Sequence, residues 1–477
     1  MENVVIELSG YIMIILLTLY TFWGFKVFSY KSKKRQKKLY GRQKICIMLI
    51  HFLCYLDLYF IQKDIAVLGL YLAEVIFIIL VYTLYGMVYK KLSKLVLNHM
   101  VLLLAISFAM LTRLSFDKAV RQFAFVSIGM GVCLVVPFVI EKFKALEYLG
   151  WIYGGIGFVL LASVLVIGTS VYGAKNWVKI GGILIQPSEF VKILFVFFLA
   201  ALFAKSTEFV DVVKVSVLAA GYVLVLVLEK DLGGALIFYI TYLFMLYVST
   251  EKLRYFLGGL IAGSAAAVVA YFLFSHVRVR VLAWSDPWGY INGQGYQITQ
   301  SLFAIGTGGW LGFGLNKGLP TSVPVVSSDF IFSAISEEFG ALFAICIILI
   351  YVSCFIMFVN ISMKMKRKFY KLIALGFSVM FMFQTFLSIG GATKLVPSTG
   401  VTLPLLSYGG SSVLSVIVIF SIIQGLYVLN QDEEIEHEKM KRRPRSGEEH
   451  EKKKRRNSEK NEKVRKKSRG TEQYERE

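Results

Sequence analysis

The chain has 477 residues, of which 56% are hydrophobic, 15% aromatic and only 17% charged. Its mean hydropathy of +0.64 is far above that of a soluble globular domain. These values exclude a soluble, an intrinsically disordered or a disulfide-stapled protein. The 52 Lys and Arg residues outnumber the 31 Asp and Glu residues, which gives a net charge of +21. Because most cations lie between the apolar runs, the composition indicates one integral membrane protein.

The apolar runs predict an all-α polytopic fold. A spanning helix needs about 20 apolar residues, and thirteen segments meet this requirement. They lie near residues 8–29, 45–62, 66–88, 97–115, 121–140, 148–170, 184–204, 212–228, 232–249, 255–275, 328–358, 369–390 and 403–429. The first run, near residues 6–30, lacks a basic leader and a small-residue cleavage site, so we expect it to be retained as a span.

The cations predict the orientation of these spans. Residues 31–44 carry eight Lys or Arg and no acid, so this turn should stay in the cytoplasm and the N-terminus outside. The odd number of spans then places the C-terminus in the cytoplasm. The last segment, 430–477, combines many charges of both signs with low hydropathy, which predicts a disordered cytoplasmic tail.

The same orientation places the loop at 276–327 outside, and its margins carry the candidate site residues. Arg278 and Arg280 either anchor a helix end at the interface or bind a phosphate. Asp329 is either a helix N-cap or a general base with a raised pKa. Glu189 and Lys192, three residues apart on one helix face, form either a structural ion pair or a ligand contact.

Other features of the sequence carry less specific chemistry. The five cysteines lie in apolar runs without C-x-x-C spacing and the histidines are scattered, so we expect no disulfides and no metal cluster. No glycine-rich nucleotide-binding motif occurs. The stretch 397–412 combines glycines, prolines and hydroxyls before the last span, and irregular backbone at that depth should line a cavity or be buried.

Several strings together resemble the SEDS family, which includes RodA, FtsW and SpoVE. The matching strings occur in the family's order. They are Asn176-Trp177, Gln186-Pro187-Ser188-Glu189 with Lys192, Asp231-Leu232-Gly233, Gly295-Tyr296-Gln297, Ser328-Asp329-Phe330-Ile331-Phe332 with Glu337-Glu338, Pro397-x-Thr399-Gly400, and Ser407-Tyr408-Gly409-Gly410-Ser411. Residues 284–288 and 318–324 look more like those of RodA than of FtsW.

The resemblance implies a ten-helix core at 96–429, preceded by an extension with about three transmembrane helices at 1–95. It also implies a peptidoglycan glycosyltransferase that polymerises lipid II into glycan strands at the outer face of the bacterial cytoplasmic membrane, for elongation, division or sporulation. The family's essential aspartate corresponds to Asp329, with Ser328 in place of the usual Thr. A class B penicillin-binding transpeptidase is the implied protein partner, alongside membrane lipid and without nucleic acid.

On this hypothesis Asp329 accepts the proton of the acceptor hydroxyl, and cations offset the charge of the pyrophosphate that leaves. The expected substrate-binding residues are Lys192, Glu189, Arg278, Arg280, Gln297, Ser407, Gly409 and Gly410. The chemistry requires no metal, although a divalent cation is compatible with it.

Two alternatives stay open at this point. A lipid II flippase would use Asp329 and Glu189 as ion-coupling groups. A noncatalytic scaffold would only activate a partner enzyme. The sequence does not decide the cellular process, nor the roles of the first 95 residues and the basic tail.

Overall fold

The computed structural model describes residues 2–171, 174–442 and 456–463. The chain divides into two units, Met1–Val428 and Leu429–Glu477. The first unit is a bundle of long helices, and it contains both the predicted core and the predicted site. In the second unit helix continues to Arg442, and residues 456–463 are also helical. The predicted disorder of the tail falls largely on residues 443–455 and 464–477, which lie outside the described residues.

The helices follow one another with short turns. Those ahead of the outer loop are α1 (Glu2–Ser29), α2 (Lys33–Gln62), α3 (Ile65–Val88), α4 (Lys94–Leu114), α5 (Phe116–Cys133), α6 (Val136–Lys142), η1 (Lys144–Tyr148), α7 (Gly150–Ile167), α8 (Pro187–Lys205), α9 (Phe209–Leu228), α10 (Leu232–Thr250) and α11 (Leu253–Leu273). The remaining ones are α12 (Ser275–Ser285), α13 (Tyr296–Gly308), η2 (Pro320–Ser322), α14 (Ile331–Lys364), α15 (Lys368–Ala392) and α16 (Gly410–Arg442).

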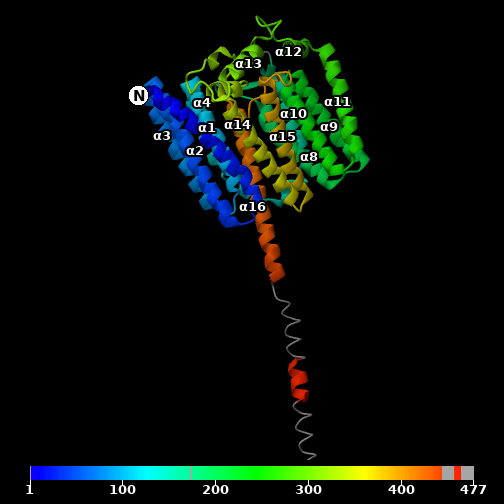
Figure 1. Cartoon of the computed structure of the whole chain (residues 1–477). Coiled ribbons are helices and arrows are strands. Elements are labelled where there is room, and N and C mark those ends of the chain that lie inside the picture. The colour runs from blue at the N-terminus through cyan, green and yellow to red at the C-terminus, as the bar shows by residue number, and fades with distance from the viewer. Residues whose placement is uncertain (1, 172–173, 443–455, 464–477) are drawn as a thin grey trace, which may run out of the picture. The chain divides into compact units, whose positions relative to one another are not determined.

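Thirteen helical segments in the described residues are long and apolar enough to cross a membrane, as the sequence predicts. One of them combines α5 with α6. Helix α4 is the most enclosed, because its whole apolar window is buried. Helices α1 to α3 lie at one side of the first unit and α11 at the other (Figure 1). The chain is therefore a multi-pass membrane protein.

A small antiparallel sheet interrupts the helical pattern before α8. Its strands are β1 (Thr169–Val171), β2 (Ala174–Ile180) and β3 (Ile183–Ile185), in the order β1-β2-β3. Gly181 and Gly182 form the turn between β2 and β3 with φ values of +57° and +86°, which suits a two-residue hairpin. The spans predicted near 148–170 and 184–204 therefore reach too far. Their Ile, Val and Leu residues have the same hydropathy in a strand as in a span, so hydropathy could not separate the two.

The loop at 276–327 is fastened to a break in α14. Gly340 has φ +82°, and around it the loop and the helix exchange backbone hydrogen bonds. Phe313 N donates to Glu337 O at 3.1 Å, and Ala341 N donates to Gly309 O at 2.9 Å. At the neighbouring turn, Arg113 Nε donates to the Glu338 carboxylate at 2.9 Å. These bonds hold the loop against the first turns of the helix that follows Asp329.

We expect Gly340→Ala to destabilise the protein by at least about 2 kcal/mol, because a non-glycine residue at this φ is strained. An added Cβ would also lie 2.4 Å from Gly312 N. The measurement is the thermal midpoint of the purified protein in detergent. Gly306→Ala on α13 is the matched control, since a Cβ at Gly306 meets nothing within 4 Å. Equal midpoints for the two variants would contradict this explanation of the break.

Candidate active site

Asp329 lies in the turn that leads into α14, and neighbouring segments fix this turn. Its backbone N–H donates to Val325 O at 3.2 Å. The segment before α16 holds the preceding residues, because Tyr408 N donates to Ser327 O at 2.7 Å and the Ser407 hydroxyl donates to Ser328 O. The turn is therefore bound by the stretch 397–410, which is far away in the sequence.

Arg280 and Asp329 both approach Gly400. A Cβ added to Gly400 would lie 3.6 Å from Asp329 Oδ2 and 3.9 Å from both terminal nitrogens of Arg280. Gly400 has φ +72°. Arg280 Nη1 also donates to Ser398 O at 2.8 Å. Three chain segments, α12, the 393–409 loop and the turn before α14, thus bring a guanidinium and a carboxylate to one point.

Burial raises the pKa of Asp329 above its ordinary value, while a hydrogen bond from Ser328 and the charge of Arg280 lower it in part. Burial likewise lowers the pKa of Arg280, and the carboxylates of Asp231 and Asp329 oppose that shift. Asp329 is thus a partly desolvated carboxyl beside a cation. This is the environment of a general base whose strength exceeds that of an exposed aspartate.

Asp231 is a second, partly buried carboxylate in the field of Arg280, at the N-terminus of α10. It accepts hydrogen bonds from Gly234 N at 2.8 Å, Asn176 Nδ2 at 3.2 Å and Gln186 Nε2 at 3.1 Å. Burial raises its pKa, and these hydrogen bonds lower it in part. The N-cap geometry agrees with a structural role for Asp231. Its proximity to Arg280 could not be predicted, because the Asp-Leu-Gly string was the only feature of the sequence that pointed to this residue.

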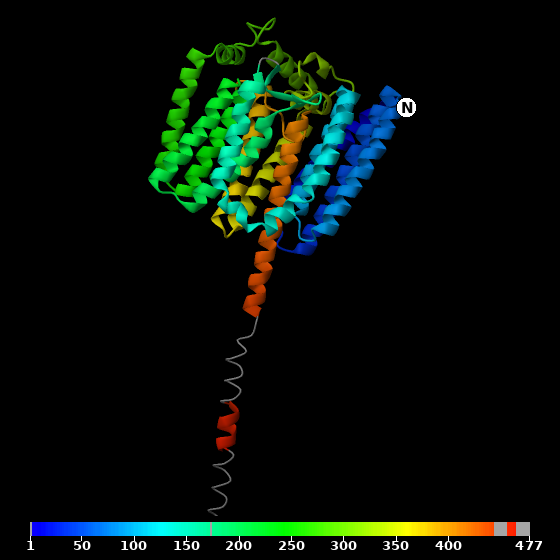
Figure 2. The ribbon, with the colours of Figure 1, turned by 180° about the vertical axis from the view of Figure 1, so that it is seen from behind.

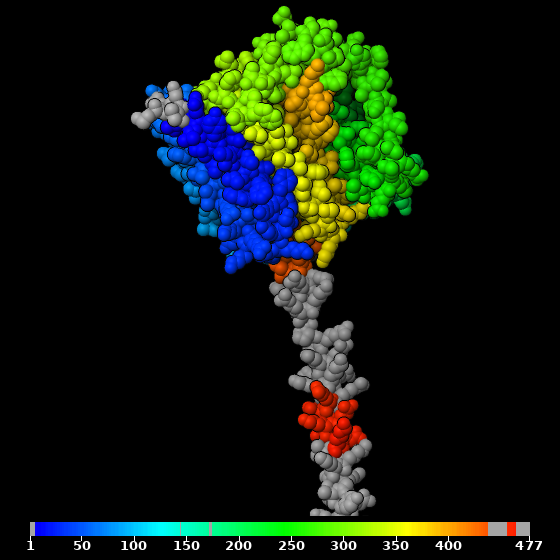
Figure 3. Space-filling model, in the orientation of Figure 1, coloured from blue at the N-terminus to red at the C-terminus, as the bar shows by residue number. Residues whose placement is uncertain are grey.

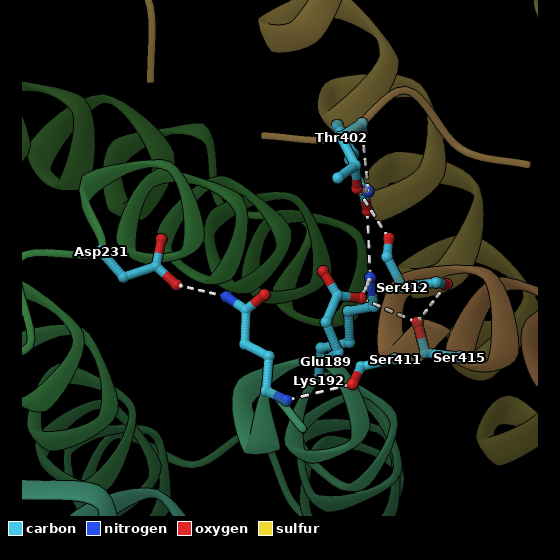
Figure 4. Close-up of polar contacts among 9 residues, drawn as sticks. Glu189, Lys192, Asp231, Thr402, Ser411, Ser412 and Ser415 are labelled. Atoms are coloured by element: carbon cyan, nitrogen blue, oxygen red, sulfur yellow. Dashed lines mark hydrogen bonds and ion pairs between the residues drawn. The ribbon is translucent and has the colours of Figure 1, made fainter. Parts of the chain in front are cut away.

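Glu189 and Lys192 form a buried ion pair at the start of α8. Lys192 Nζ also donates to Gln384 Oε1 at 3.1 Å, and the Ser415 hydroxyl donates to Glu189 Oε2 at 2.8 Å. Figure 4 shows this network. Glu189 and Lys192 belong to α8, and their side chains point toward the hydroxyls of Ser412 and Ser415 on α16. In this structure the pair is a salt bridge that ties α8, α15 and α16 together.

The network extends to the loop that carries Gly400. Gln384 Nε2 donates to Thr402 O at 3.1 Å, and the hydroxyls of Thr402 and Ser412 lie 2.7 Å apart. Neither Gln384 nor Thr402 was among the predicted site residues. An isolated Gln in an apolar run carries no sequence signal, and Thr402 is one of several hydroxyl residues in the stretch 397–412 that the sequence does not distinguish. Their contacts connect the Glu189–Lys192 pair to the segment that holds Asp329 and Arg280.

Ser407, Gly409 and Gly410 serve the packing of this segment. Gln122 bridges the first two, since its Nε2 donates to Ser407 O at 3.0 Å and its Oε1 accepts from Gly409 N at 3.3 Å. A Cβ at Gly410 would lie 3.1 Å from the ring of Phe125. Of these three predicted residues, Ser407 contacts the turn before Asp329 directly, whereas Gly409 and Gly410 pack the segment that carries Ser407 against α5.

Arg278 and Gln297 are placed differently from the other predicted residues. Both are exposed. Arg278 precedes Arg280 by two positions on α12, so the two side chains leave the helix on nearly opposite sides. Within the part of the chain that the structure describes, no hydrogen bond or ion pair joins Arg278 or Gln297 to Asp329. The described residues also contain no group of three or more His, Cys, Asp or Glu side chains that could hold a metal ion.

Glu229, two residues before Asp231, is fully buried, and its carboxyl oxygens have no hydrogen-bond partner among the described residues. Burial, with a smaller contribution from Asp231, raises its pKa to about 8. In the unfolded chain the same group ionises near pH 4.5. The folded state is therefore disfavoured progressively as the pH rises from about 4.5 to about 8.

We expect Glu229→Gln to raise the thermal midpoint relative to the unchanged protein at pH 9, by at least about 2 °C, and to change it less at pH 5. The reason is that the amide removes the cost of ionising a buried carboxyl. The measurement is a thermal unfolding series across this pH range, with Glu208→Gln, an exposed site, as the control. A difference that stays constant with pH would refute the assignment.

Comparison with known proteins identifies relatives of the chain. Residues 91–431 match the family described as "Cell cycle protein", FtsW, RodA and SpoVE. The peptidoglycan glycosyltransferase RodA of Mycobacterium tuberculosis (strain H37Rv) is 37% identical over 325 residues, which cover 64% of this chain and 69% of that protein. The probable peptidoglycan glycosyltransferase FtsW of Aliivibrio salmonicida is 33% identical over 367 residues, covering 73% of this chain and 91% of the relative.

Solved structures show the same fold. The structure "Structural coordination of polymerization and crosslinking by a peptidoglycan synthase complex" contains a chain with a TM-score of 0.60 and 26% identity, covering 72% of this chain and 99% of that one. The rod shape determining protein RodA of Thermus thermophilus has a TM-score of 0.52 at 24% identity, covering 70% and 96%. The second likeness concerns the fold alone.

Proposed function

Because the chain belongs to the FtsW, RodA and SpoVE family of cell cycle proteins, we propose that it is a peptidoglycan glycosyltransferase. Its substrate is lipid II, which it polymerises into glycan strands at the outer face of the cytoplasmic membrane. Relatives named peptidoglycan glycosyltransferase RodA and FtsW support the reaction class. The observation that carries the proposal is the partly buried Asp329 carboxyl, which lies with the Arg280 guanidinium beside Gly400.

In this reaction Asp329 accepts the proton of the 4-hydroxyl on the acceptor sugar. That oxygen attacks the anomeric carbon of the donor, the new glycosidic bond forms, and the bond to undecaprenyl pyrophosphate breaks. One base suffices, because a single displacement converts the α-linked donor into a β-linked strand. The raised pKa of Asp329 suits a group that must take up a proton at neutral pH.

Arg280 is the cation that stabilises the developing charge of the pyrophosphate, since a guanidinium can donate two parallel hydrogen bonds to such an anion. Lys192 has a different role, because Glu189 and Gln384 already engage its ammonium group. Lys192 is a positioning residue for the loop that carries Gly400. Arg278, which is exposed, interacts with the membrane interface or with an incoming headgroup.

The site is reached from the membrane. Figure 3 shows that one face of the molecule is hollowed between α11 (green) and α15 with the segment that follows it (orange). Helix α12, which carries Arg280, follows α11 directly, and Gly400 lies in the second segment. A lipid-linked substrate would enter the site through this hollow while its hydrocarbon tail stays in the bilayer.

The distribution of cations supports an outside N-terminus and a cytoplasmic C-terminus. We assign residues 1–95 to an extension, residues 96–429 to the catalytic core and residues 430–477 to a cytoplasmic tail. The structural relative is a peptidoglycan synthase complex that coordinates polymerization and crosslinking. It supports a crosslinking partner for this chain, and a class B penicillin-binding transpeptidase fits that role.

We expect Asp329→Ala and Asp329→Asn to reduce polymerisation at least about 100-fold, because both remove the base. The assay uses purified protein, labelled lipid II and a cognate transpeptidase whose own catalytic serine is disabled. Glycan ladders on a gel are the readout. Asp286→Asn is the matched control, since Asp286 is an aspartate of the same outer loop that only caps a turn at Gly289.

Ladders that persist in both Asp329 variants would refute the assignment of the base. The absence of ladders from the unchanged protein, with every partner tested, would instead favour lipid II transport. A measurement of lipid II movement across vesicles then separates the two functions.

A further inference from the structure

A second site lies away from Asp329, in a groove between α9, α10 and α11. The groove has a volume of about 420 Å³, which lies within the range of small-molecule sites. Its walls are mostly apolar, with Val212, Ala219 and Leu243 among them. Arg254 and Tyr255 line it near the turn between α10 and α11. It therefore combines a long apolar channel with a cation at one end.

Helix α11 leaves room for a ligand on the side that lines the groove. None of its residues is buried, and it stands as the outermost helix on its side of the bundle (Figure 2). It packs on α10 through two glycines, since a Cβ at Gly259 would lie 2.3 Å from Leu243 and one at Gly263 would lie 2.5 Å from Tyr239. The side that faces α9 is the open one.

The volume distinguishes between occupants. The α9 lining runs from Phe209 to Val223, a helix length of about 21 Å. A helix about 10 Å across would fill about 1,600 Å³ over this length, far more than the groove offers. An extended hydrocarbon chain of about half that width would fill about 400 Å³. The enclosed part of the groove therefore has room for one acyl chain, whereas a partner helix could only rest against its open side.

The cations at its end indicate the headgroup. Lys252 and Arg254 lie 5.5 Å and 5.3 Å from the ring centre of Tyr255. Neither forms an ion pair with another described residue. The only acid beside them in the turn, Glu251, lies in the field of Lys368. Arg254 lines the groove, and Lys252 lies next to it on the ring of Tyr255. Two neighbouring cations at the end of a groove between transmembrane helices match the headgroup of an anionic lipid.

We propose that this groove binds an anionic phospholipid of the inner leaflet, with its phosphate at Arg254 and Lys252 and one acyl chain along α9 and α11. The site is separate from the proposed active site and does not depend on the proposed reaction. The bound chain completes the packing of α11.

The test is native mass spectrometry of the full chain, purified in detergent and titrated with phosphatidylglycerol or with phosphatidylcholine. The unchanged protein retains phosphatidylglycerol in preference to phosphatidylcholine. The double variant Lys252→Gln/Arg254→Gln loses at least about fivefold in phosphatidylglycerol affinity, because each cation near the surface contributes to anionic lipid binding. The matched control is Lys364→Gln/Lys366→Gln, which removes two exposed cations near the end of α14.

A second variant tests the acyl channel. Gly258 lines the groove, and a Cβ at this position meets nothing within 4 Å, so Gly258→Leu should fold and fill the groove. We expect it to reduce the retention of phosphatidylglycerol while the thermal midpoint is preserved. Equal retention of both lipids, an unchanged affinity in the cation variant, unchanged retention in Gly258→Leu, or a partner helix crosslinked into the groove would each overturn the proposal.

Discussion

The site depends on one electrostatic constraint, which is that a buried carboxylate at the edge of a membrane needs a cation close by. Asp329 and Arg280 satisfy this constraint beside Gly400, where both side chains lie within 4 Å of the position that a Cβ would take. Because the two residues belong to segments that are distant in the sequence, the fold must hold those segments at a fixed position relative to each other. The backbone bonds around Gly340 fix the helix that follows Asp329, and Arg280 fixes the 393–409 loop through Ser398.

The polar interior beneath this pair has a supporting role. The buried ion pair of Glu189 and Lys192 is costly to desolvate, and such a pair is retained when further hydrogen bonds satisfy both charges. Gln384 and Ser415 supply those bonds, and through them the pair determines where α8, α15 and α16 sit relative to the Gly400 loop. Removing one partner would leave an unpaired charge at membrane depth and disturb this network. Because Gln384 also holds the Gly400 loop at Thr402, such a change would reach the site through the position of that loop.

Much of the fold could be predicted from the sequence, because spanning helices must be long and continuously apolar. The number of spans follows from this requirement. The shared helix face of Glu189 and Lys192 allowed either an ion pair or a ligand contact, and the structure forms the ion pair. The hairpin at 169–185 could not be recognised, since its apolar residues resemble the end of a span. Arg278 and Arg280 were equivalent in the sequence, and only the direction in which each leaves α12 separates them. Asp329 could be recognised from its motif, whereas the roles of Asp231 and Gln384 become visible only from their contacts across the fold.

The most direct measurement of the central pairing is the pH dependence of polymerisation in the unchanged protein and in Arg280→Gln. Arg280 lowers the pKa of Asp329, so its removal should weaken the reaction and move the acidic limb of the profile to higher pH by about one unit. Arg280→Lys, which keeps the charge, should leave the limb close to its original position. An acidic limb that does not move in Arg280→Gln would contradict a base that is tuned by this arginine.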